Sequence, residues 1–143
     1  MTRGLLDVNV LIALLDADHS LHQQAREWFG RNAEAGWASC PLTQNGCVRI
    51  MSHPGYPNAL SVRSVMDRLR EATRSPHHEF WTDDVSLLDP RIADPSRIHG
   101  PRQLTDVYLL ALAVHRSGRF VTFDASVPLS AIAGAEKKHI VAL

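Results

Sequence analysis

The chain has 143 residues, a length that suits one ordinary domain. Hydrophobic residues make up 45% and charged residues 21%, close to globular averages, which excludes intrinsically disordered and fibrous proteins. Fifteen Lys and Arg residues balance fifteen Asp and Glu residues. The chain therefore lacks the overall basic field of many nucleic-acid-binding proteins, and any site for a polyanion must be local.

The first apolar run and the cysteines bear on where the protein works. The run over residues 5–15 is interrupted by Asp7 and Asn9 and is shorter than the roughly 20 residues of a membrane span. Cys40 and Cys47 form neither a C-x-x-C redox pair nor half of a four-ligand zinc pattern. We therefore expect a cytoplasmic protein with reduced cysteines and no membrane attachment.

Hydrophobic periodicity predicts strands that alternate with helices. Strands are expected over residues 3–7, 37–40, 79–81, 119–124 and 139–143. Helices are expected over residues 8–15, 21–33, 41–51, 61–73, 105–117 and 128–134. Residues 83–102 hold three prolines and should form an extended loop, and Gly118 should supply the C-terminal turn of the preceding helix. This order predicts an α/β fold: one domain, residues 1–143, built as a three-layer α/β/α sandwich with a mostly parallel sheet of four to five short strands.

Polar residues follow the predicted strands at the edge where parallel α/β sheets bind ligands. Asp7 ends the first strand, and Asp124 ends the strand that begins at residue 119. Asp106 falls in the first turn of the longest helix, and Gln44 in the first turn of the helix that starts at Pro41. Both helices should begin at the same edge, so the three carboxylates and the amide are expected to form one cluster.

Such a cluster predicts a divalent cation. Two carboxylates about 4 Å apart repel by about 4 kcal/mol at an effective dielectric constant near 20, so a compensating positive charge is needed. Oxygen ligands without His or Cys favour Mg²⁺ or Mn²⁺. Metal sites of this kind activate water for phosphodiester hydrolysis, so the residues predict a nuclease.

Other polar residues are candidates for supporting roles, each with a structural alternative. Asn9 is expected either to bond a metal-bound water or to cap the following helix, and Thr105 and Thr122 to support the acids. A single Asp at a strand end or in a first helical turn is also common for capping alone. His77 and His78 should point in opposite directions along a strand and are expected at the surface.

Arginines are the candidates for holding RNA. The alternative interpretation is that these arginines form an ordinary solvated helix surface. The expected RNA contacts are Arg63, Arg70, Arg74 and Arg102.

Four segments together resemble the PIN-domain ribonucleases, specifically the VapC toxins of bacterial VapBC toxin–antitoxin systems. They are LLDVNVLIAL, PLTQNGCVRI, LTDVYLLALAV and FVTFD, and they span nearly the whole chain. The resemblance implies that Asp7, Asp106 and Asp124 bind Mg²⁺ or Mn²⁺ for RNA hydrolysis, with Gln44 where the family commonly has Glu. A further family acid, one helical turn beyond Asp106, is missing.

The resemblance also implies partners. These are RNA as the substrate, a VapB-like antitoxin that covers the acid site, and a second copy in a homodimer. Two apolar helix faces are expected either to form a groove for an antitoxin helix or to be core. Their residues are Leu21, Ala25, Trp28 and Phe29 on the first helix, and Val62, Val65, Met66 and Leu69 on the second.

Two other interpretations stay open at this point. The neutral Gln44 is compatible with a catalytically weakened PIN domain that acts mainly as an RNA- or antitoxin-binding module. An Asp at a strand end is also typical of phosphatases that use it as a nucleophile. Such enzymes need a lysine near the phosphate, and the only lysines are Lys137 and Lys138, near the C-terminus.

Overall fold

The computed structural model describes residues 2–143, so Met1 of the expected domain lies outside the described residues. Its strands are β1 (Gly4–Leu6), β2 (Trp37–Ser39), β3 (His78–Phe80), β4 (Arg119–Thr122) and β5 (Ile140–Ala142). Its α-helices are α1 (Val8–Leu15), α2 (His22–Asn32), α3 (Pro41–Met51), α4 (Val62–Thr73) and α5 (Leu104–His115). The segment expected as a helix over 128–134 contains one 3-10 turn, Leu129–Ala131.

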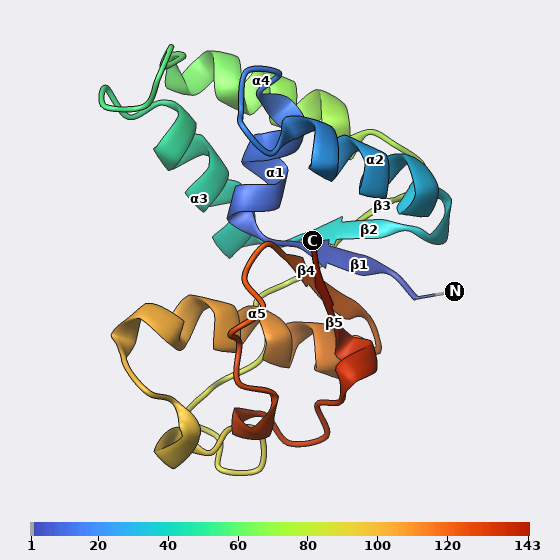
Figure 1. Cartoon of the computed structure of the whole chain (residues 1–143), viewed down its shortest axis with the longest axis vertical. Coiled ribbons are helices and arrows are strands. Elements are labelled where there is room, and N and C mark those ends of the chain that lie inside the picture. The colour runs from blue at the N-terminus through green and yellow to red at the C-terminus, as the bar shows by residue number, and fades with distance from the viewer. Residues whose placement is uncertain (1) are drawn as a thin grey trace.

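The five strands form one parallel sheet in the order β3-β2-β1-β4-β5. Helices α1 to α4 lie on one face of the sheet and α5 lies on the other (Figure 1). The three-layer α/β/α sandwich expected from the sequence is therefore confirmed. In the centre, β1 pairs with β4 so that Leu6 lies opposite Val121, which places the residues that follow both strands at one edge.

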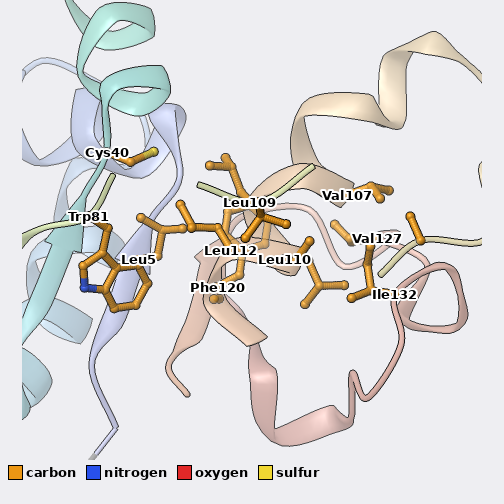
Figure 2. Close-up of a cluster of buried hydrophobic side chains, with 14 of the residues drawn as sticks. Leu5, Cys40, Trp81, Val107, Leu109, Leu110, Leu112, Phe120, Val127 and Ile132 are labelled. Carbon is orange, nitrogen blue, oxygen red and sulfur yellow. The ribbon is translucent and has the colours of Figure 1, made fainter. Parts of the chain in front are cut away.

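Both faces of the sheet are buried, because neighbouring residues of a strand point to opposite faces. Leu5 and Phe120 pack with Leu109 and Leu112 of α5 in one cluster (Figure 2). The neighbouring residues of these strands point to the other face of the sheet, where their side chains pack against α1 and α4. That second cluster includes Leu6, Val10, Trp37, Val65 and Val121.

The C-terminus of α5 differs from the expectation for Gly118. Ser117, not Gly118, takes the left-handed conformation, with φ 54°, and the amides of both residues donate to carbonyls of the last helical turn. Gly118 is required for space instead. A Cβ there would lie 2.6 Å from Cη2 of Trp81 and 2.8 Å from the backbone oxygen of Arg3.

The connection over residues 83–102 is extended, as expected, with short 3-10 turns at Pro95–Arg97 and Pro101–Gln103. An isolated antiparallel bridge between Ala93 and Ile132 ties it to the segment before β5. Across residues 2–143 no helix combines the length and apolar character needed to cross a membrane.

Candidate active site

A pocket of about 480 Å³ opens at the carboxyl edge of the sheet, where β1 and β4 end and α1 and α5 begin. All three predicted acids line it, together with the three residues expected to support them. Its lining residues are Asp7, Val8, Asn9, Arg49, Ile50, Thr105, Asp106, Thr122, Phe123 and Asp124.

Asp7 is the most firmly held of the acids. Its backbone amide donates to the carbonyl of Val121 at 2.9 Å, and its side chain caps α1 by accepting from the amide of Val8 at 2.7 Å. Its other carboxylate oxygen accepts from the Thr122 hydroxyl at 2.8 Å. Burial raises the pKa of Asp7 although both hydrogen bonds oppose this, because the side chain is only 6% exposed.

Asp106 lies in the first turn of α5 and is partly buried. Burial, followed by repulsion from Asp7 and Asp124, raises the pKa of Asp106 to about 6. No hydrogen bond among the described residues opposes this shift. The charges of Asp7 and Asp124 therefore act on the carboxyl group of Asp106 within the pocket.

Asp124 is exposed in the loop after β4, and its pKa is shifted in the opposite direction to that of Asp106. One of its carboxylate oxygens accepts from both the amide and the hydroxyl of Ser126, at 2.8 and 2.6 Å, and these bonds lower its pKa. Its own amide donates to the Thr122 hydroxyl oxygen at 3.1 Å. Thr122, completely buried, therefore links the carboxylate of Asp7 to the backbone of Asp124.

The chemistry of this pocket fits a divalent cation, although its acids stand apart. Within the described part of the chain, no three His, Cys, Asp or Glu side chains are arranged closely enough to hold a metal ion. Asp7, Asp106 and Asp124 line the walls instead. All three offer carboxylate oxygens, the ligands that Mg²⁺ and Mn²⁺ prefer, and repulsion from Asp7 and Asp124 adds to burial in raising the pKa of Asp106.

Asn9 and Thr105 lie at the pocket with exposed side chains. Asp7 caps α1, so the capping alternative for Asn9 is wrong. The remaining expectation, that Asn9 contacts a water bound at the pocket, stays a prediction.

Gln44 lies elsewhere than expected. Its Nε2 donates to the hydroxyl oxygen of Ser39 at 2.9 Å, and its side chain lines a separate groove of about 240 Å³ between α3 and α4. Arg49, five residues later, lines the acid pocket. At about 100° per residue the two positions point about 140° apart around the helix, which is why one faces the acids and the other does not.

The two adjacent histidines also differ. His77 is exposed, but His78 is partly buried, with its ring 4.5 Å from that of Trp37 and its Nε2 2.8 Å from the Ser39 hydroxyl oxygen. Burial lowers the pKa of His78. The expectation of a surface position is therefore wrong for His78, which joins Ser39 and Gln44 in a structural hydrogen-bond network.

The arginines proposed from the sequence do not line the acid pocket. Arg70 and Arg74 pair with Asp67 and Glu71 of the same helix at 2.8 and 2.7 Å, with both partners exposed. Arg63 lies on the same helix, and Arg102 lies in the 3-10 turn before α5. Arg49 is the cationic residue of the pocket, and sequence reasoning missed it although it stands in the segment PLTQNGCVRI.

Comparison with known proteins finds a protein family and relatives that match nearly the whole chain. The model of the PIN domain family matches residues 4–134. Ribonuclease VapC44 of Mycobacterium tuberculosis is 55% identical over 141 residues, 99% of each chain. Ribonuclease VapC38 of the same organism is 46% identical over 125 residues, 87% of this chain and 86% of the relative.

Two solved structures share the fold. The crystal structure of Mycobacterium tuberculosis VapC20, described as a sarcin–ricin loop cleaving toxin, aligns with a TM-score of 0.63 at 8% identity, over 91% of this chain and 96% of that one. That of VapBC2 from Rickettsia felis, bound to a DNA fragment from their promoter, aligns with a TM-score of 0.54 at 10% identity, over 87% and 89%. At these identities the likeness concerns the fold alone.

Proposed function

The chain belongs to the PIN-domain family, among its VapC ribonucleases, and from this premise we propose that it is a toxin whose endoribonuclease activity depends on Mg²⁺ or Mn²⁺. The observation that carries the metal dependence is the sharing of one pocket by Asp7, Asp106 and Asp124, with the pKa of Asp106 raised to about 6. Three carboxylates in one pocket favour a divalent cation, because they supply the oxygen ligands that Mg²⁺ and Mn²⁺ prefer.

In this proposal Asp7, Asp106 and Asp124 would hold the ion, which when bound would supply activation of water for phosphodiester hydrolysis. Thr122 fixes one oxygen of Asp7, and the amide of Val8 fixes the other, so this carboxylate keeps its orientation. Ser126 occupies one oxygen of Asp124, and the second oxygen has no hydrogen bond among the described residues. Asp106 has no such tie and is free to turn toward the other two acids.

We further propose a VapB-like antitoxin as partner, with a groove of about 340 Å³ between α1, α2 and α4 as its site. Of the residues expected there, Phe29 and Leu69 line the groove, whereas Ala25 and Val65 are fully buried in the core. The groove is mostly apolar, as a helix in a groove requires. A homodimer and a cytoplasmic location remain expectations.

Cleavage of total cellular RNA by the purified chain tests the proposed activity. Fragments should appear with Mg²⁺ or Mn²⁺, disappear with EDTA, and be absent for Asp7→Asn, Asp106→Asn and Asp124→Asn variants that keep the wild-type circular dichroism spectrum. Undiminished cleavage in EDTA would refute the metal mechanism. RNA binding without cleavage would favour the binding-module interpretation, and hydrolysis of a phosphomonoester such as p-nitrophenyl phosphate would favour the phosphatase.

Growth of cells that express the chain tests the toxin role. Induction should arrest growth, Asp7→Asn should abolish the arrest, and co-expression of the adjacent reading frame should relieve it. Unchecked growth on induction of well-folded wild-type protein would contradict a toxin.

A further inference from the structure

We propose that Arg49 is a catalytic residue of this ribonuclease and that it binds the phosphate of the RNA in the pocket that the three carboxylates also line. The inference rests on the ribonuclease activity proposed above and adds to it the group that recognises the substrate. Among the described residues that line the acid pocket, Arg49 alone is cationic.

The packing of α3 places Arg49 there. A Cβ on Gly46 would lie 2.8 Å from Cγ2 of Val8, the residue directly after Asp7, so glycine lets α3 approach the start of α1 closely. Arg49 follows three residues later, close to one helical turn, and so faces the same side of α3 as Gly46. The backbone of α3 therefore fixes Arg49 beside the pocket.

The guanidinium of Arg49 forms no ion pair with a carboxylate of the described residues. Throughout residues 2–143 no carboxylate lies within 4.0 Å of it, in contrast to Arg70 of α4 and to Arg74, which caps the end of α4. Two of the pocket acids have internal partners, Asp7 with Thr122 and Asp124 with Ser126. The guanidinium of Arg49 therefore has its donors available to an anion that enters the pocket.

An RNA phosphate is the anion that matches this arrangement. Three carboxylates repel a phosphodiester, so a pocket that they line needs positive charge to bind RNA. The planar guanidinium of arginine presents paired donors that fit two phosphate oxygens. Arg49 would neutralise phosphate oxygens on which negative charge grows during attack on phosphorus.

Arg49→Ala, Arg49→Lys and the control Arg31→Ala test this proposal. Arg31 is exposed near the end of α2, so its removal makes the same charge change away from the pocket. With the RNA fragment that the wild-type protein cleaves, kcat/KM should fall by about 100-fold or more in Arg49→Ala. The fall should be smaller in Arg49→Lys, which keeps the charge but not the paired donors, and Arg31→Ala should match wild type.

Two further readouts separate a phosphate contact from a structural role. In the Asp7→Asn background, where cleavage is blocked, Arg49→Ala should weaken binding of that fragment and reduce the slope of log affinity against log salt by about 0.7. Mn²⁺ affinity measured by calorimetry should stay equal to wild type or increase, because a positive charge has been removed beside the acids.

The outcomes are distinct. Activity of Arg49→Ala within twofold of wild type, an unchanged salt slope, an equal loss in Arg31→Ala, or loss of Mn²⁺ binding in Arg49→Ala would each overturn the assignment of Arg49. Failure of the wild-type protein to cleave RNA would instead refute the proposed function on which the assignment rests.

Discussion

Replacement of Asp106 by Asn should make the protein more stable while it abolishes activity. The pKa of Asp106 is raised from its ordinary value of 3.8 to about 6, so ionisation of this side chain costs more in the folded than in the unfolded chain. Each tenfold change in proton affinity corresponds to about 1.4 kcal/mol, which sets an upper limit of about 3 kcal/mol. Because Asp106 is only partly buried, solvent screening reduces the expected gain to about 1–2 kcal/mol.

The pH dependence of this gain identifies its cause. Below about pH 4 the Asp106 carboxyl is protonated in both the folded and the unfolded chain, so the variant is no more stable than wild type. As the pH rises through 6, Asp106 ionises in the folded chain as well, and this lowers the free energy of unfolding of wild type but not of the variant. The difference between the two free energies of unfolding should therefore grow from pH 4 to 6 and stay constant above.

Urea denaturation followed by circular dichroism, in EDTA from pH 4 to 8, measures this difference. Asp18→Asn is the matched control, because its carboxylate is exposed and lies outside the pocket. Saturating Mg²⁺ should stabilise wild type more than Asp106→Asn, because the ion relieves the repulsion. A variant that is less stable than wild type at pH 7.5, or a difference that does not change with pH, would refute the reasoning.

Three further substitutions test other contacts. Thr122→Val leaves a buried oxygen of Asp7 without its donor and should lower the free energy of unfolding at pH 7.5 by about 1–3 kcal/mol. Thr122→Ser keeps the hydroxyl and should stay close to wild type, so equal losses in both variants would contradict the role of the hydroxyl. Gly118→Ala should lower the free energy of unfolding, measured by heat or urea, by about 1–3 kcal/mol because the new Cβ has no room. Gly30→Ala, within α2 and with open space around it, should be neutral or stabilising. A neutral effect of Gly118→Ala would disprove the crowding. Gln44→Glu should leave Mn²⁺ affinity within twofold of wild type in calorimetry, because the side chain lies between α3 and α4; a tenfold increase would return Gln44 to the acid pocket.

The acids could be predicted from the sequence because their position follows from topology alone. Asp7 directly follows a buried strand and Asp124 follows another, so pairing of the two strands brings them together whatever their side chains do. Asp106 needed only the first turn of a helix that begins at the same edge. The layer order followed similarly from alternating strand and helix periods.

Details that depend on rotation about a helix or on long-range packing could not be predicted in this way. Gln44 and Arg49 stand on one helix, and the packing of that helix, with Gly46 against Val8, decides which of them faces the acids. The role of Gly118 depends on the side chain of Trp81, 37 positions earlier in the chain. Sequence spacing carries no information about either contact.

Binding of Mn²⁺ to the purified chain, measured by isothermal titration calorimetry, tests the central claim most directly. We predict saturable binding to the wild-type protein and its loss in both Asp7→Asn and Asp106→Asn, with Asp18→Asn as the control that binds as wild type does. Binding that survives in both pocket variants, or a wild-type protein that cleaves RNA without binding Mn²⁺, would contradict a metal site formed by these carboxylates.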